Sequence, residues 1–276
     1  MAGWWHEDTC LLRPVAPGPE NVVSVREQAS YPLMPFSNRV AGGRFSFGGV
    51  DYALSRDHRE TRHALHGNAL YAVWEIAEAS ATHALLRLHA APERQDMQFF
   101  PFRYEAEQLY ELWAGALHVR LRITNRDAKP FPAGMGHHLF FPRAPETKLS
   151  FVASAMWEND GDMLPAAPST VWREAFAAGK RLGDEGFDHC FEDWAGTARI
   201  EYPQLGYGLA LEASAGLGHA VLFTPKNKPF FAFEPVSHLN DAFNRGDDMA
   251  RHGVRILNPG ETLEGWFSLT YLPCPA

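Results

Sequence analysis

One carboxylate in this chain lies where acids are rarely found. Glu234 follows the apolar residues 230–233 and stands directly before Pro235, so we expect it at the end of a buried strand. A carboxylate in such a place needs something that pairs with it, shifts its titration or binds to it. Glu234 is therefore the first candidate for a residue with a chemical role.

Histidine offers the second chemical group. Of the thirteen histidines, His66 precedes Gly67, upstream of an expected strand that carries Trp74, whereas His137 and His138 enter an aromatic run. Adjacent side chains on an extended strand point to opposite faces, so only one of His137 and His138 can enter a given pocket. Imidazole exchanges protons near neutral pH. For each histidine, a structural role with hydrogen bonds inside the fold is the alternative.

The spacing does not favour metal, nucleophilic or nucleotide chemistry. The chain has no HxH pair, and its single HxxH pair, His63 with His66, lacks a helix or a nearby third ligand. It has no GxSxG nucleophile motif, and its glycine-rich pieces lack the strand-to-helix context of phosphate loops. Acid and base groups that act without a metal or an organic cofactor are the chemistry that remains.

A period of two residues dominates the elements that must position these groups. Residues 117–123 alternate apolar and polar side chains, and residues 45–54 form an expected hairpin around Gly48 and Gly49. Further strands are expected at residues 84–89, 102–112, 198–202, 207–213, 220–223, 230–233 and 263–272. Helical spacing is limited to residues 169–180. The pattern predicts an all-β protein, a large antiparallel β-sandwich with few short helices.

Length and composition indicate the number of domains, the kinds of partner and the state of the cysteines. With 276 residues and 46% hydrophobic content, we expect one domain over residues 1–276. The net charge of −8, without long runs of either sign, argues against nucleic acid as a partner. No apolar stretch reaches the about 18 to 20 residues that span a bilayer, and the start lacks a signal-peptide layout, so a cytoplasmic protein is expected. Cys10, Cys190 and Cys274, an odd number at wide spacings, are expected to be reduced thiols.

Five motifs, in order, resemble those of the aldose 1-epimerase family, the galactose mutarotase-like proteins. They extend over most of the chain, roughly residues 15–272. The matching residues are Asn38 and Arg39 of an NR motif, His66 of LHG, His138 of an HxYF-like motif in GHHLFFPR, Asp188 of a DxxF element in FDHCFEDW, and Glu234 of FEPVSHLNDAFN. The resemblance implies the β-supersandwich fold of the galactose mutarotase-like proteins.

The resemblance also implies an activity. Glu234 would take the proton of the anomeric hydroxyl as general base, and His138 would protonate the ring oxygen as general acid. The sugar ring opens, C1 rotates about its bond to C2, and closure on the other face interconverts the α and β anomers. Substrate-binding roles fall by similarity to His66, Arg39, Asp188, Asn38 and Trp74. A small sugar is the implied partner, and neither a metal nor an organic cofactor is required.

The match has departures, and two alternative functions stay open. Leu139 replaces the usual aromatic residue after His138, and the LHG segment lacks the double glycine of the galactose-specific branch, so galactose is not implied. A hexose 6-phosphate epimerase would hold the phosphate with Arg39, Lys226 and Lys228. A noncatalytic sugar-binding module is the other alternative, although a binder needs no acid and base pair. Arg39, Asp188 and Trp74 also have structural alternatives, as a hairpin arginine, a turn residue and a core aromatic.

Overall fold

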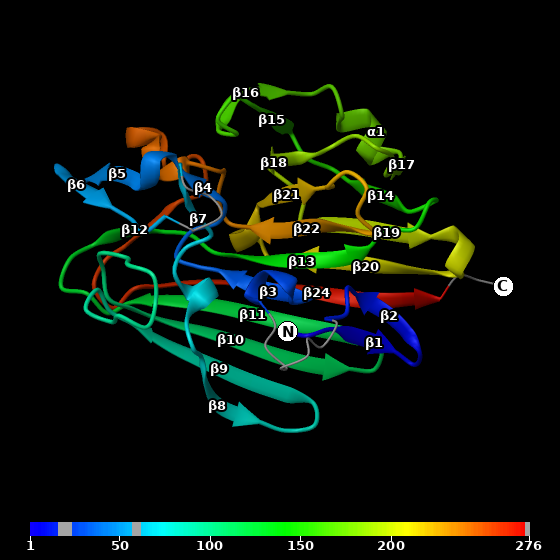
Figure 1. The fold of residues 1–276 in the computed structure, drawn as a ribbon, viewed down its shortest axis with the longest axis horizontal. Helices are drawn as coiled ribbons and strands as arrows, with labels where there is room; N and C mark the ends of the chain where they lie inside the picture. The colour runs from blue at the N-terminus through cyan, green and yellow to red at the C-terminus, as the bar shows by residue number, and fades with distance from the viewer. Residues whose placement is uncertain (16–23, 57–61, 274–276) are drawn as a thin grey trace.

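Two large antiparallel sheets form the body of the protein (Figure 1). The computed structural model describes residues 1–15, 24–56 and 62–273. The nine-stranded sheet has the order β17 (Lys180–Arg181), β14 (Lys148–Phe151), β19 (Thr197–Tyr202), β20 (Tyr207–Ala213), β24 (Thr262–Pro273), β11 (Ala116–Asn125), β10 (Tyr104–Trp113), β9 (His83–Ala90) and β8 (Glu75–Ala79). The seven-stranded sheet has the order β16 (Pro165–Ser169), β15 (Ala155–Asn159), β18 (Asp188–Glu192), β21 (His219–Phe223), β22 (Phe230–Val236), β13 (Gly136–Pro142) and β3 (Ser30–Leu33).

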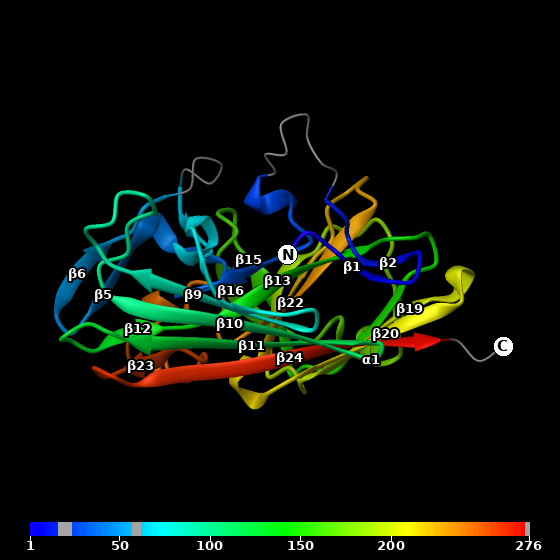
Figure 2. The same ribbon diagram turned by 90° about the horizontal axis from the view of Figure 1, so that it is seen from below.

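Short elements complete the architecture. The two-stranded pairs are β1 (Trp4–His6) with β2 (Thr9–Leu12), β4 (Arg39–Val40) with β7 (Ala64–Leu65), β5 (Arg44–Phe47) with β6 (Val50–Ala53), and β12 (Phe131–Ala133) with β23 (Arg255–Leu257). The hairpin β5–β6 and the end of β24 lie at opposite ends of the molecule's long axis (Figures 1 and 2). The prediction of a large antiparallel β-sandwich with few short helices is confirmed.

Alternating burial along β11 explains why this segment forms a central strand of the nine-stranded sheet. Leu117, Val119, Leu121 and Ile123 of β11 are all buried, and β11 pairs along its length with β10 on one side and β24 on the other. The polar residues between them face away from the core. The strand predicted at residues 117–123 is confirmed, because side chains that alternate along a strand place all apolar members on one face.

Aromatic side chains join the two sheets. Phe151 of β14 contacts Phe191 of β18 and Phe233 of β22, with ring centroids 4.9 and 5.0 Å apart. His137 of β13 contacts Phe267 of β24, with ring centroids 5.2 Å apart. The inner face of the seven-stranded sheet therefore packs on the nine-stranded sheet. Side chains on its other face are free to build a site.

The hairpin prediction is confirmed, and the segment with helical spacing contains an α-helix that is shorter than the segment. Gly48 and Gly49 both have positive φ, 60° and 76°, as a two-residue hairpin turn requires. Within residues 169–180 only α1 (Arg173–Ala177) is α-helical, with Phe176 as its one buried residue. The ends of the expected helix are taken by β16 and β17. The remaining helical turns are of the 3-10 type: η1 (Val25–Glu27), η2 (Ala41–Gly43), η3 (Ala69–Tyr71), η4 (Pro203–Leu205), η5 (Ala215–Leu217), η6 (Ala242–Asn244) and η7 (Gly246–Asp248).

The strand that carries Glu234 does not end there, contrary to expectation. β22 continues through Pro235 to Val236. Pro235 lacks an N–H, but the pairing of β22 with β13 is interrupted between Ala232 and Val236, so no ladder bond is lost at this position. Glu234 is thus an interior strand residue.

The structure bears on the cysteines and on membrane-spanning segments. Cys10 and Cys190 form no disulfide, whereas Cys274 lies outside the described residues. In the part of the chain that the structure describes, no helix is long and apolar enough to cross a membrane.

His137 makes the stability of the fold depend on pH. It is buried between the sheets, where its Nε2 contacts the Tyr110 hydroxyl at 3.2 Å, and burial lowers its pKa well below 6.5. The unfolded chain binds a proton at this residue below pH 6.5 and the folded chain does not. The stabilisation is therefore complete above pH 6.5 and is lost as the pH falls.

We expect His137→Gln to weaken this dependence. Between pH 7.5 and pH 5, the free energy of unfolding of the variant should fall by about 2 kcal/mol less than that of the wild type, since each pH unit below the unfolded pKa costs about 1.4 kcal/mol. Urea denaturation at the two pH values measures both losses. Equal losses in the two proteins would contradict the argument.

Candidate active site

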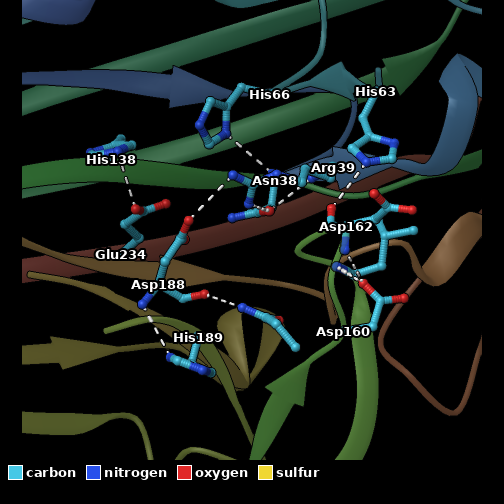
Figure 3. A network of polar contacts seen from close by, with 12 residues as sticks. Asn38, Arg39, His63, His66, His138, Asp160, Asp162, Asp188, His189 and Glu234 are labelled. Atoms are coloured by element: carbon cyan, nitrogen blue, oxygen red, sulfur yellow. Dashed lines mark hydrogen bonds and ion pairs between the residues drawn. The ribbon is translucent and has the colours of Figure 1, made fainter. Parts of the chain in front are cut away.

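A glutamate and a histidine meet on the outer face of the seven-stranded sheet. The strand register places Tyr31 of β3 opposite His138 of β13, and Val221 of β21 opposite Glu234 of β22. Because β13 and β22 are neighbours, the side chains of His138 and Glu234 lie side by side. His138 Nε2 is 3.1 Å from Glu234 Oε1 (Figure 3). The alternation predicted for the two histidines is confirmed, since His137 points into the sandwich and His138 away from it.

Burial shifts the titration of both partners. It raises the pKa of Glu234 well above its ordinary value; the negative charge of Asp188 adds to this effect and Arg39 opposes it. Burial also lowers the pKa of His138 well below its ordinary value, and the neighbouring His66 and arginines act in the same direction. Both shifts favour the uncharged forms, a neutral imidazole beside a protonated carboxyl group, so a single proton held by the pair is favoured on Glu234.

Two chain segments, which meet where β4 pairs with β7, position Asn38 and His66 beside this pair. The His66 N–H donates to the Asn38 carbonyl at 2.9 Å, and the Asn38 N–H donates to His66 Nδ1 at 3.1 Å. Both residues have positive φ, 56° and 66°, a conformation that needs such reciprocal bonds to hold it. Since Nδ1 accepts a hydrogen bond, the neutral imidazole of His66 carries its proton on Nε2. Its ring lies edge-on to that of His138, with centroids 5.6 Å apart.

An arginine and an aspartate border the same site. Arg39 Nη2 is 3.3 Å from Asp188 Oδ2, and Asn38 Oδ1 accepts hydrogen bonds from the backbone N–H and Nη1 of Arg39. The side chains of Arg39 and Asp188 are 13% and 21% exposed, so each keeps one edge toward solvent. This pair can offer donors and acceptors to the hydroxyls of a ligand.

A cavity of about 250 Å³ joins these groups. Six of the seven site residues predicted from the sequence line it: Asn38, Arg39, His66, His138, Asp188 and Glu234. The other lining residues were not predicted as site residues: Tyr31, Arg13, Arg26, Leu65, Phe140, Phe223 and Phe230. Phe140 and Phe230 could have been suspected, because they lie an even number of positions from His138 and Glu234 on the same strands. Nothing in the local sequence pointed to the two arginines.

Other predicted residues lie elsewhere. Trp74 is not among the lining residues; its indole N–H donates to the Ala69 carbonyl at 3.0 Å. Lys226 and Lys228 are exposed in the loop between β21 and β22 and also do not line the cavity. His63 accepts the Gly42 N–H and lies beside Asp162, apart from His66 (Figure 3). Among the described residues, no group of three or more His, Cys, Asp or Glu side chains has the geometry to hold a metal ion.

The glycine of the LHG motif has a steric explanation. Gly67 has φ of 69°, and a Cβ at this position would lie 2.1 Å from the Met34 carbonyl oxygen. Backbone thus packs directly on backbone at the turn that holds His66. A side chain cannot enter without moving the turn.

Fold and site together define a class of β-sandwich proteins with a buried acid and base pair at the floor of a polar cavity. The chain belongs to the aldose 1-epimerase family, whose model matches residues 2–270. The resemblance inferred from the five motifs is therefore confirmed.

Individual relatives agree with this assignment. The uncharacterized protein YphB of Escherichia coli K12 is 30% identical, over 98% of this chain and 91% of its own length. A crystal structure of an E. coli K12 protein assigned to the aldose 1-epimerases superposes with a TM-score of 0.87 at 28% identity, over 99% of this chain and 92% of the other. The structure of galactose 1-epimerase from Lactobacillus acidophilus gives a TM-score of 0.77 at 18% identity, over 98% and 87% of the two chains. This last similarity concerns the fold alone.

We expect Gly67→Ala to destabilise the protein more than Gly48→Ala. Both positions have positive φ, which costs about 1 kcal/mol for alanine. At Gly48 a Cβ meets no atom within 4 Å, whereas at Gly67 it also clashes with Met34. Thermal unfolding should show a drop in Tm at least twice as large for Gly67→Ala. Similar drops for the two variants would refute the packing argument.

Proposed function

We propose that this protein is an aldose 1-epimerase that interconverts the α and β anomers of a single sugar. The observation that carries the proposal is the contact of 3.1 Å between His138 and Glu234 on the cavity floor. The cavity, at about 250 Å³, is smaller than the roughly 300–1,000 Å³ of typical ligand sites, which suits one sugar ring. Arg39, Asp188 and His66 supply hydrogen-bonding groups around it.

Ring opening needs one base and one acid. Glu234 accepts the proton of the C1 hydroxyl, the bond between C1 and the ring oxygen breaks, and the ring oxygen receives a proton from His138. C1 becomes an aldehyde and turns about its bond to C2. In the reverse steps, the C5 oxygen attacks the other face of C1 and returns its proton to His138, while Glu234 returns a proton to the aldehyde oxygen. Protons balance over the cycle.

A pair that holds one proton can supply both the acid and the base that ring opening needs. Ring opening starts with Glu234 ionised and His138 protonated, and it leaves Glu234 protonated and His138 neutral. The latter state is the one that burial favours. The environment thus stabilises the proton arrangement of the open-chain stage. Ring closure returns Glu234 to its ionised form and His138 to its protonated form, and the contact of 3.1 Å between Nε2 and Oε1 keeps the two groups together throughout.

Neighbouring groups hold the sugar for this exchange. His66, with its proton on Nε2, donates to the ring oxygen or to an adjacent hydroxyl. Arg39 donates to hydroxyls, and Asp188 accepts from them. Glu234 Oε2 has no hydrogen-bond partner among the described residues, so the C1 hydroxyl would also satisfy a buried acceptor.

We expect Glu234→Gln and His138→Asn each to slow anomer exchange by about 100-fold or more, the range of general acid and base catalysis. Each variant keeps a polar group of similar size but cannot exchange the proton. Polarimetry and saturation-transfer NMR on a panel of free sugars measure the exchange, and ligand-detected NMR measures binding.

The surface pair Glu78 and His83 provides matched controls. Their side chains are 67% and 41% exposed and lie 3.9 Å apart on the nine-stranded sheet. Glu78→Gln and His83→Asn should leave the exchange rate unchanged. A wild-type protein that binds a sugar without accelerating its anomer exchange would refute the enzyme proposal and favour a binding module.

The pH profile offers a separate test. The working pair holds one proton, and burial lowers the pKa at which it takes up a second one, on His138, well below 6.5. It also raises the pKa at which the pair loses its only proton, from Glu234, well above 4.5. We therefore expect no loss of kcat/KM as the pH falls through 6.5, and a decline only further below. An acid limb at or above pH 6.5, measured by NMR exchange, would contradict the single-proton pair.

A further inference from the structure

Two arginines from the N-terminal part of the chain line the proposed sugar site. Arg13 directly follows β2, and Arg26 belongs to η1. Arg13 Nη2 donates to the carbonyl oxygens of Arg26 and Gln28, at 3.0 and 2.8 Å. Arg26 Nε donates to the Tyr71 hydroxyl at 2.8 Å. These contacts tie both segments to the rim of the cavity.

Aromatic stacking fixes the position of the Arg13 guanidinium. Its Cζ lies 3.7 Å from the ring centroid of Phe140 and 4.5 Å from that of Phe230. These rings belong to β13 and β22, the strands that carry His138 and Glu234. Stacked arginines are held rigidly and present their N–H groups at the edge of the plane, which suits the recognition of carboxylates and phosphates.

The charge of Arg13 is not matched by an ion pair. Its side chain is half-buried, its described hydrogen bonds use Nη2 alone, and no described carboxylate lies within 4 Å of it. Glu27, which acts on it electrostatically, is exposed. Of the two acids that line the cavity, Asp188 pairs with Arg39 and Glu234 with His138. A guanidinium in such a place gains most from an anionic ligand.

The distance from the reacting centre suits one sugar ring. The Phe140 centroid is 4.2 Å from that of His138 and 3.7 Å from Arg13 Cζ, so Arg13 lies no more than about 8 Å from the His138 ring. In the proposed mechanism, His138 faces the ring oxygen and Glu234 faces C1. The other carbon bonded to the ring oxygen is C5 of a pyranose, and its exocyclic C6 extends away from C1, so an anion on C6 can span the distance of about 8 Å to Arg13.

We propose that the substrate is an aldose with an anionic group, a phosphate or a carboxylate, on its exocyclic C6, and that Arg13 and Arg26 bind this group. The inference rests on the proposed epimerase function and adds the substrate class to it. It also replaces Lys226 and Lys228, the cations expected from the sequence, with two arginines that reach the cavity.

The test compares anionic sugars with their neutral parents. Saturation-transfer NMR gives kcat/KM for anomer exchange of glucose, glucose 6-phosphate, glucuronate, galactose, galactose 6-phosphate and galacturonate. We expect at least one anionic sugar to exceed its parent by tenfold or more, mainly through a lower KM. The phosphate and the carboxylate series show which anion is preferred.

Variants then assign the preference to Arg13. Arg13→Gln should reduce the ratio of kcat/KM for the anionic sugar to that for its parent by about tenfold or more, the usual effect of losing one charged hydrogen bond. Arg13→Lys keeps the charge and should retain part of the ratio. Arg143, which donates to the Pro225 carbonyl and does not line the cavity, gives the matched control Arg143→Gln, with an unchanged ratio.

The outcomes separate the two proposals. Acceleration of neutral sugars alone, or an unchanged ratio in Arg13→Gln, overturns the anion site and leaves the epimerase function standing. No acceleration of any sugar overturns the epimerase function and the substrate class with it. Thermal unfolding and the rate on the neutral parent show in each variant whether the fold is intact.

Discussion

The buried contact between Glu234 and His138 is the interaction on which the rest of the site depends. Burying a carboxylate and an imidazole is costly unless each satisfies the other, and here neighbouring strands hold them 3.1 Å apart. The sheet makes this contact possible because one face of β13 and β22 packs in the core and the opposite face lines the cavity. His137 and Phe233 face the other sheet and stabilise the sandwich, whereas His138 and Glu234 face the cavity. A register shift of one residue in either strand would turn its core side chains toward the cavity and its cavity side chains toward the core, which would remove both the core packing and the pair.

Precision around the pair comes from backbone, not from long side chains. Asn38 and His66 adopt left-handed conformations and hold each other through two hydrogen bonds, while Gly67 lets this turn lie directly against Met34. Asp241, which also has a positive φ of 55°, donates its N–H to the Arg39 carbonyl and accepts the N–H of Ala41. Strained residues therefore gather on one side of the cavity. Such conformations persist only where the surrounding structure determines them, and here they orient the groups proposed to bind the sugar.

The proposed reaction and the proposed substrate class depend on different residues of the cavity. The five motifs lie on the strands and turns around one cavity, which six of the motif residues line. Arg13 and Arg26 belong to no motif and come from the N-terminal segment that packs over the edge of the seven-stranded sheet. They change the character of the cavity from neutral and polar to partly cationic. The proposed reaction therefore depends on the sheet, and the proposed substrate class on what covers it.

The sequence by itself determined the fold class and most of the site. Alternation at residues 117–123, the glycine turn at residues 48–49 and the five ordered motifs were sufficient, because periodicity and special backbone conformations leave local signals. Local signals failed where the outcome depended on contacts distant in sequence. β22 continues through Pro235 because its neighbour leaves a gap in the ladder, and residues 169–180 form strands at both ends because other strands pair with them. Only the tertiary structure decided that Trp74 lies outside the cavity and that Arg13 and Arg26 line it. Strand register and the packing of distant segments decide which side chains share a cavity. The spacing of neighbouring residues does not specify either of them.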